Sequence, residues 1–294
     1  MSLAAEARTS VVASFEEALD GIEDGATIGI GGAVTAAHPM ALVRALAASG
    51  VKGLTVVAPT NGLDVEILIA AGCVETLISA YVGMEGAAGV APVYRRAVED
   101  GSVEVKDFDE AHCIAGFRAA AQKLPFLPVR GGVGTSYADI TPELIPFKDP
   151  VAGEELLAVT ALNLDVALIF AEAADEFGNV QTSSSGHMDQ VLGAAAERVV
   201  VQVDRVVAND EIRKDPLRTW YWKRTQVVRA PFGTHPYSSA TMIADADHLA
   251  EAIAAGRAGG EELDAYMKRY VHDAPDHDSY LEEIGIRRIA SLQI

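Results

Sequence analysis

One carboxylate, Glu110, lies where an α/β enzyme would keep a catalytic group. It follows a short β-branched run (Val103 and Val105) and a polar turn at 107–109, and it opens a stretch of small residues that predicts a helix over 110–124. A carboxylate in a first helical turn, just beyond the carboxyl end of a strand, lies at the edge where open α/β sheets bind their ligands. Glu110 is therefore the candidate catalytic residue.

The same carboxylate has a structural explanation. Asp109 is a natural N-cap, and the helix dipole favours an acidic residue in the first turn. Two neighbours are weaker candidates. His112 is close enough in sequence to Glu110 for that carboxylate to raise the pKa of the imidazole or to order it. Glu85 lies between glycines in the loop 83–89. A solvated loop charge is the commoner role for a residue such as Glu85.

Two glycine-rich loops are candidates for binding a negatively charged ligand atom. Gly31 and Gly32 follow a strand predicted for 26–30, and Gly131 and Gly132 follow another short apolar run. Their backbone N–H groups would hold an oxyanion, because glycine permits close approach. The first loop lacks the GxGxxG spacing, which argues against a dinucleotide site. A tight strand-to-helix turn explains that loop equally well.

The elements that position these residues follow from the apolar periodicity. The run around 103–105, the helix 110–124 and the run 126–129 form a predicted βαβ crossover, which indicates a parallel sheet. Further buried strands are predicted at 26–30, 54–58, 76–82, 156–159, 166–171, 198–203 and 225–230, with helical stretches between most of them. The fold class is thus α/β, an open, largely parallel sheet with helices on both faces. Loops at Gly31, Gly131, Asp175 and Gly233 should meet at one edge of it.

The chain divides into two predicted parts. Residues 1–243 form the α/β domain, and residues 244–294 form a polar helical extension. Three prolines between 137 and 153 predict a long surface excursion. The first residues show no signal peptide, and no apolar stretch reaches the ~18 residues of a membrane span. We therefore expect a cytoplasmic protein.

Composition excludes several classes of function. The formal net charge of −19 argues against nucleic acid or an anionic membrane as a partner. Cys73 and Cys113 lack metal-ligand spacing, so no metal is expected and both read as reduced apolar fillers. The loop 175–189 reads as a hydrogen-bonded turn cluster. Its serines 183–185 lack a G-x-S-x-G context, which argues against a serine hydrolase.

Several segments together resemble the A (α) subunit of family I coenzyme A transferases, the group that includes glutaconate CoA-transferase. The resemblance runs from about residue 15 to 240 through AAAQKLPFLPVRGGVGTS, ALNLDVALIFAEAADEFGNVQ, AAAERVVVQVDRVV and VVRAPFGTHP. It implies a sheet related to that of sugar-phosphate isomerases, and a B (β) subunit that completes the active site, in an A2B2 heterotetramer. It also implies an acyl-CoA thioester as substrate and no further cofactor.

The resemblance leaves the reaction open. In those transferases a B-subunit glutamate attacks the acyl-CoA, and this chain would supply glycine-loop donors and part of the CoA channel. Transferase A subunits tend to carry asparagine at the position of Glu110. An acidic residue there, in DFDEAHC, is similar to the A subunit of the hydrolase that opens the last steroid ring of cholesterol, where it would activate water. The basic residues that precede the proline of that hydrolase's first glycine loop are replaced here by residues 35–37, Thr-Ala-Ala.

Three functions are therefore carried forward. The first is the A subunit of an enzyme that moves CoA between an acyl-CoA and a carboxylic acid. The second is a hydrolase that opens a cyclic ketone ring of an acyl-CoA, with Glu110 as general base. The third is a ligand-sensing module without catalysis, which is disfavoured because the sequence shows no DNA-binding segment and the net charge opposes one.

Overall fold

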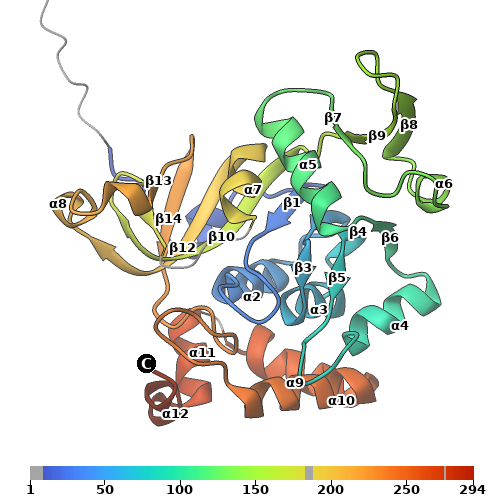
Figure 1. Ribbon diagram of the computed structural model, residues 1–294. Coiled ribbons are helices and arrows are strands. Elements are labelled where there is room, and N and C mark those ends of the chain that lie inside the picture. Colours follow the sequence, from blue (N-terminus) through green and yellow to red (C-terminus); the bar gives the residue numbers. More distant parts are fainter. Residues whose placement is uncertain (1–8, 183–187, 275) are drawn as a thin grey trace, which may run out of the picture.

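The central sheet of the computed structural model has nine strands within the described residues, which are 9–182, 188–274 and 276–294 (Figure 1). Most of them run parallel, in the order β14 (Thr225–Arg229), β12 (Ala196–Val207), β10 (Leu164–Asp175), β1 (Thr27–Ile30), β2 (Leu54–Val57), β4 (Val74–Ser79) and β6 (Glu104–Asp107). Two short antiparallel strands, β11 (Val180–Gln181) and β13 (Thr219–Trp220), extend the far end of β10. The predicted, largely parallel sheet is confirmed.

Helices cover both faces of this sheet, as predicted. Neighbouring strand residues face opposite cores: Val56 packs into one and Val57 into the other. The first core includes residues of α2 (Met40–Ser49), α3 (Leu63–Ala70) and α4 (Pro92–Asp100), and the second includes residues of α5 (Glu110–Ala121) and α7 (Asp189–Ala195). Burial on both faces explains why these strands are continuous Val, Ile, Leu and Ala runs and do not alternate with polar residues.

The strand order reverses between β1 and β10. From β1 the chain adds β2, β4 and β6 on one side, and β10, β12 and β14 lie on the other. The N–H of Gly31, just beyond β1, donates to the carbonyl of Leu168 in β10 at 2.9 Å. Such a reversal opens a crevice at the carboxyl ends of the strands, where ligands of open α/β sheets bind. The first glycine loop lies at this point.

The predicted βαβ crossover through 110–129 is wrong in its last strand. β6 and α5 form as expected, but β7 (Phe126–Val129) pairs antiparallel with β9 (Glu155–Thr160) in a separate three-stranded sheet. Pro128 has no N–H to donate to a ladder. Exposed and half-exposed positions alternate along β7, whereas the central strands are buried. A four-residue apolar run does not reveal which sheet it joins.

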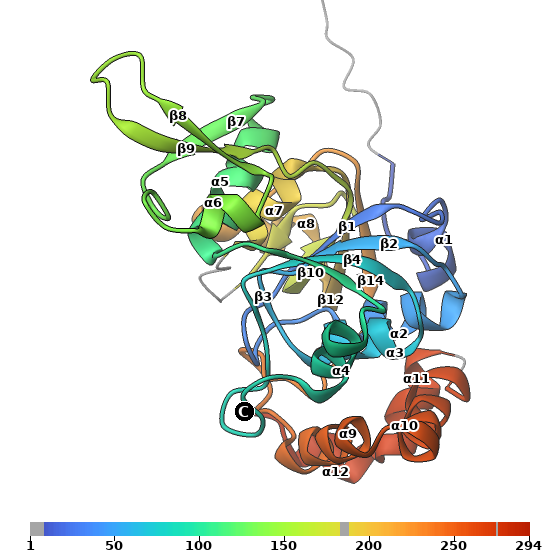
Figure 2. The same cartoon turned by 90° about the vertical axis from the view of Figure 1, so that its right-hand side faces the viewer.

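The proline-rich stretch 137–153 is more regular than predicted. It contains α6 (Tyr137–Ile140) and β8 (Leu144–Lys148), the second partner of β9. β8 is an edge strand, the position that tolerates Pro146. Figure 2 shows this small sheet at one end of the molecule and the C-terminal helices at the other.

The C-terminal residues are helical, as predicted. They form α9 (Ala246–Ala258), α10 (Gly260–Met267), a π-helical turn η2 (Lys268–His272), α11 (His277–Ile284) and α12 (Ile286–Ser291). Leu249, Ile253 and Tyr266 share one core with α2 and α3. The boundary between 243 and 244 therefore stays a prediction. None of the described helices has the length and apolar character needed to cross a membrane.

The remaining short elements serve as connections. They are α1 (Phe15–Leu19), β3 (Thr60–Asn61) paired with β5 (Tyr81–Val82), α8 (Asn209–Ile212) and the 3-10 turn η1 (Pro216–Arg218). α1 begins with a capping box in which Ser14 and Glu17 satisfy each other's backbone N–H groups.

A buried glutamine side chain of the sheet caps α2. Gln202 of β12 is fully buried, and its Oε1 accepts from the N–H groups of Ala41 and Leu42 at 3.0 and 3.2 Å. Gln202→Met keeps the side-chain volume but leaves the Leu42 N–H without an acceptor, so we expect a loss of about 1–3 kcal/mol in the free energy of unfolding. Chemical denaturation measures it. Gln190→Met, at an exposed position of α7, is the control and should change it by less than about 0.5 kcal/mol. Equal losses in both variants would refute the capping role.

Candidate functional site

The first glycine loop is already bonded within the chain. The N–H of Gly31 donates to Leu168, and the N–H of Gly32 donates to Oδ1 of Asp189 at 2.9 Å. The next two N–H groups, of Ala33 and Val34, donate to backbone carbonyls. A ligand oxyanion would therefore have to displace an internal partner.

Asp189 occupies the place predicted for a bound anion. It is the first residue of α7, and a Cβ added to Gly31 would lie 2.6 Å from its Oδ1. Burial raises the pKa of Asp189 to about 7, against the lowering effect of the Gly32 N–H and of His38. The chain thus holds its own carboxylate at the reversal of strand order. The ligand-binding role of Gly31 and Gly32 stays a prediction.

A buried polar cluster, not predicted from the sequence, lies beside this loop. Nδ1 of His38 is 2.9 Å from Oδ2 of Asp64, which also accepts from the side chain of Asn61. Tyr237 accepts from the N–H of Leu63 at 2.5 Å. Burial by itself would raise the pKa of Asp64, but His38 and these hydrogen bonds outweigh it and lower that pKa. Nε2 of His38 has no hydrogen-bond partner among the described residues. Only the His-Pro step at the start of α2 signalled this cluster.

Glu110 is exposed at the first residue of α5. Asp109 is the N-cap, as the structural explanation requires, and it accepts from the N–H of His112 at 2.8 Å. Within the described part of the chain, the Glu110 carboxylate makes no hydrogen bond or ion pair that would fix its position. It is therefore free to face a substrate or another chain.

His112 pairs with Asp109 and not with Glu110. Its Nδ1 lies 2.7 Å from Oδ1 of Asp109, and its Nε2 lies 3.2 Å from the carbonyl oxygen of Gly131. The ring is buried and packs edge-on against Tyr137. The expected ordering of His112 by Glu110 is thus not found, because the carboxylate that lies beside the ring is the N-cap Asp109.

The second glycine loop lies over this histidine and is open at Gly131, where an added Cβ would meet only His112, at 3.7 Å. Gly132 is packed more closely: its φ is +85°, and an added Cβ would lie 3.0 Å from the ring of Tyr137. In the ranges that the structure describes, the N–H groups of Gly131 and Gly132 donate to no protein acceptor. The structure therefore brings Gly131 and Gly132 to the first turn of α5, and Gly31 and Gly32 to Asp189.

The four loops predicted to crowd one edge meet only in part. Gly233 contacts α2, the helix that follows the first glycine loop, because its carbonyl accepts from the N–H of Ala41 at 2.9 Å. Asp175 lies roughly 23 Å beyond Leu168 along the extended strand β10. Gly131 follows a strand of the other sheet. The long β10 and the misassigned β7 explain the difference.

The remaining candidates keep structural roles. The Asp175 carboxylate accepts from the N–H groups of Phe177 and Asn179 and from the side chain of Asn209, so its loop begins as the predicted turn cluster. Serines 183–185 lie outside the described residues. Glu85 is exposed in a tight turn closed by hydrogen bonds between Met84 and Ala88.

Neither cysteine is set up for chemistry. Cys73 and Cys113 are buried and free, and burial raises the pKa of both thiols. Among the described residues, no group of three or more His, Cys, Asp or Glu side chains is placed to hold a metal ion.

Both glycine loops and Glu110 lie within a stretch that matches a known family. The sequence profile of coenzyme A transferase matches residues 12–225. The chain belongs to the coenzyme A transferase family. The predicted resemblance is confirmed.

Individual relatives point to the A subunits of this family. The chain is 37% identical to the "cholesterol ring-cleaving hydrolase IpdA subunit" of Rhodococcus jostii over 76% of this chain and 78% of that protein. It is 29% identical to the A subunit of glutaconate CoA-transferase from Acidaminococcus fermentans over 93% of this chain and 91% of that one. The crystal structure of that transferase superposes with a TM-score of 0.92 and 28% identity, covering 97% and 96% of the two chains.

One relative is longer. An uncharacterized protein of Archaeoglobus fulgidus is 34% identical over 95% of this chain, which spans 65% of that protein. The transferase-family fold, including the C-terminal helices, thus extends over nearly the whole chain, whereas the activity of the complete protein is a matter for proposal.

The buried carboxylate at the first loop should make stability depend on pH. The pKa of Asp189, about 7 in the native chain, exceeds its ordinary value of 3.8, so the native state binds more protons than the unfolded state between pH 4 and 7 and loses stability as pH rises through that window. Asp189→Asn cannot ionise and keeps an oxygen for the Gly32 N–H. We expect its advantage in unfolding free energy over the parent to grow by about 2.5 kcal/mol between pH 5 and pH 8, with a matching rise in its advantage in Tm. Asp264→Asn, an exposed aspartate of α10, is the control. An advantage of Asp189→Asn that is independent of pH would contradict this account.

The two glycine loops should differ in their tolerance of a side chain. Gly32 has a φ of +98°, and an added Cβ would lie 2.8 Å from the ring of His38, so Gly32→Ala should cost at least about 2 kcal/mol of stability. Gly131→Ala meets only an ordinary contact and should stay within about 0.5 kcal/mol of the parent. Thermal denaturation compares them, and equal Tm values would show that the first loop is not the packed turn described.

Proposed function

We propose that this chain is the A subunit of a two-subunit enzyme that moves CoA between an acyl-CoA thioester and a carboxylic acid. The B subunit would complete the active site, in an assembly of two A and two B chains. The proposal is supported by membership of the coenzyme A transferase family and by the likeness over nearly the full chain to the A subunit of a glutaconate CoA-transferase. No cofactor beyond the thioester substrate is proposed.

The observation that carries the proposal is the open first turn of α5. Glu110 is exposed there without an ion-pair partner among the described residues, and the unpaired N–H groups of Gly131 and Gly132 lie beside the same turn, across His112. A carboxylate and two free donors at one surface form half of a site for a carbonyl group. The other half would come from the partner that covers this surface.

In the transferase reaction this chain would stabilise charge and would not attack. A B-subunit glutamate adds to the thioester carbonyl carbon, the C–S bond breaks, and a mixed anhydride and CoA thiolate result. The thiolate then attacks the glutamyl carbonyl, which releases the first acid and leaves a glutamyl-CoA thioester for the acceptor to resolve by the reverse steps. The N–H groups of Gly131 and Gly132 would hold the oxyanion of each addition.

Ring-opening hydrolysis is the second candidate. The 37% identity to a ring-cleaving hydrolase subunit favours it, and so does the accessible carboxylate of Glu110. Glu110 would take a proton from water while the hydroxide adds to the ring ketone. The adjacent C–C bond would then break to give a carboxylate, and the carbanion would accept a proton. Glu110 would need the partner's surface over it to become a stronger base.

Assembly is the first test of either reaction. The purified chain alone should show no turnover of acyl-CoA substrates, and activity should appear when its B subunit is added. Full turnover by this chain alone would end both versions of the proposal, because each requires a shared site.

Glu110→Gln distinguishes the two reactions. Transferase chemistry predicts less than about tenfold loss in kcat, together with a glutamyl-CoA thioester on the B chain that hydroxylamine traps. A general base predicts a loss of roughly 10²-fold or more, without that thioester. The matched control is Glu262→Gln, an exposed carboxylate in the first turn of α10, which should change neither kcat nor, beyond about 1 kcal/mol, stability. We expect the transferase result; a large loss without a trapped thioester would replace it by hydrolysis.

A further inference from the structure

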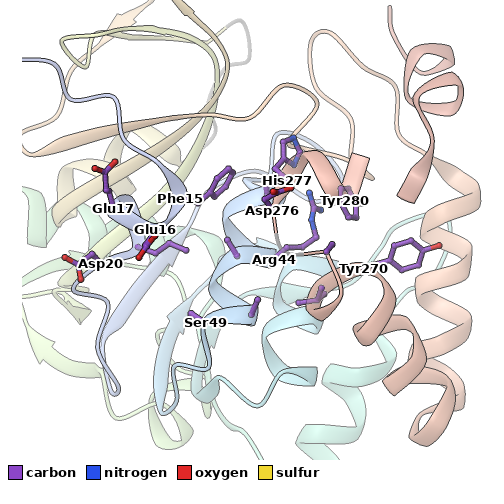
Figure 3. A pocket seen from close by; sticks show the side chains of 16 residues that line it. Phe15, Glu16, Glu17, Asp20, Arg44, Ser49, Tyr270, Asp276, His277 and Tyr280 are labelled. Atoms are coloured by element: carbon purple, nitrogen blue, oxygen red, sulfur yellow. The ribbon is translucent and has the colours of Figure 1, made fainter. Parts of the chain in front are cut away.

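A cavity of about 700 Å³, whose lining Figure 3 shows, lies on the face of the sheet opposite to α5. It is bounded by α1, by α2 and by the C-terminal helical segments η2 and α11. α2 borders the first hydrophobic core and α5 the second, so the sheet separates this cavity from Glu110. Its volume is in the range of sites for small organic ligands. The catalytic proposal makes no use of it.

A buried arginine at one end of the cavity has no carboxylate partner. Arg44 of α2 is 7% exposed; its Nη1 donates to the carbonyl of His235 at 3.0 Å, and its Cζ lies 3.5 Å from the centre of the Tyr280 ring. In the described ranges, Nη2 has no hydrogen-bond partner, and no carboxylate oxygen lies within 4 Å of the guanidinium. The nearby Asp245 is paired with Arg288.

The buried guanidinium of Arg44 lowers the stability of the fold. Burying a guanidinium destabilises a fold unless an anion or a full set of acceptors compensates the charge, and one carbonyl and one ring do so only in part. Burial accordingly lowers the pKa of Arg44. A residue that weakens the fold in this way is best explained by a ligand that supplies the missing anion.

A histidine lining the same cavity supplies an unpaired acceptor. Nε2 of His277 lies 2.7 Å from the carbonyl oxygen of Pro231, and since that oxygen only accepts, Nε2 carries the proton. Burial and the charge of Arg44 lower the pKa of His277 to about 4, so the ring is neutral at pH 7. Its Nδ1 therefore presents a lone pair, and it has no donor among the described residues.

The rest of the lining limits the charge of the ligand. Three carboxylates of α1 and its end, Glu16, Glu17 and Asp20, lie at the end of the cavity away from Arg44, as Figure 3 shows. A fourth lining carboxylate, Asp276, lies beside His277 and accepts from the N–H of Ser279 as the N-cap of α11. They would repel a polyanion such as a phosphate ester or CoA itself. Between the two ends the walls are mainly apolar, with Phe15 on one side and small α2 side chains such as Ala45 on the other.

We propose that this cavity is a second ligand site, for a small organic carboxylate that has an apolar body and a hydroxyl or ammonium donor. The carboxylate binds the free edge of Arg44, the donor binds Nδ1 of His277, and the apolar body fills the space along α2. The acidic end favours an ammonium group over a second anion. The site is separate from the acyl-CoA site.

Ligand-observed NMR with four probes tests the chemistry. Mandelate (carboxylate and hydroxyl) and phenylalanine (carboxylate and ammonium) should bind at least threefold more tightly than phenylacetate, which lacks the donor. Benzyl alcohol, which lacks the carboxylate, should show no binding. The tighter of the first two identifies the donor. If benzyl alcohol binds as well as mandelate, or none of the carboxylates binds at millimolar concentration, the proposal is wrong.

Two variants place the binding in this cavity. Ala45→Leu keeps the helix and fills the space, so it should weaken the binding of the tighter probe at least tenfold; Ala254→Leu, at an exposed position of α9, should not change it. Arg44→Met should remain folded, with a Tm at least equal to the parent's, and should lose binding. Unchanged binding in Ala45→Leu would overturn the proposal, and so would binding that disappears when the B subunit is added, because the cavity would then be a partner interface.

Discussion

The contact between Asp189 and the first glycine loop is the constraint on which the rest of the sheet depends. At the reversal of strand order, β1 ends against β10, and the first residue of α7 must come close to the backbone that leaves β1. Only glycine permits this at position 31, where a Cβ would lie 2.6 Å from the carboxylate. The N–H of Gly32 then bonds to Asp189, across 157 residues of sequence. This bond fixes α7 beside the β1–β10 pair, which joins the two halves of the parallel sheet.

This contact also decides where chemistry can take place. The crevice at a reversal of strand order usually receives the ligand, but here the chain fills it with its own carboxylate and with the buried His38–Asp64 pair. The free donors and the free carboxylate lie at α5 and the second glycine loop, which the small antiparallel sheet carries. A site at that surface is open on one side, which is consistent with the membership of a family whose relatives include proteins named as subunits.

The sequence predicted the parts of the fold whose signals are local. Buried runs such as Val166–Ala171 and the capped start of α5 at Glu110 were placed correctly, because burial on two faces and an N-cap each leave a pattern within a few residues. The sheet that β7 joins and the partner of His112 were not, since a four-residue run and a nearby carboxylate fit two arrangements equally well. Asp189 fell inside a predicted turn cluster because the groups around it, Gly32 and His38, are distant in sequence.

Two buried ionisable groups show how a structural charge differs from an available one. Asp189 is satisfied from within: it has the N–H of Gly32 and the nearby His38, and a pKa near 7 lets it become neutral where the fold requires it. Arg44 can neither lose its charge nor pair it with a carboxylate. A guanidinium stays protonated at any physiological pH, and no carboxylate faces it within the described residues. The first group can be explained by the fold alone. The second keeps a positive charge beside a cavity, and an anion from outside the chain is the simplest way to compensate it.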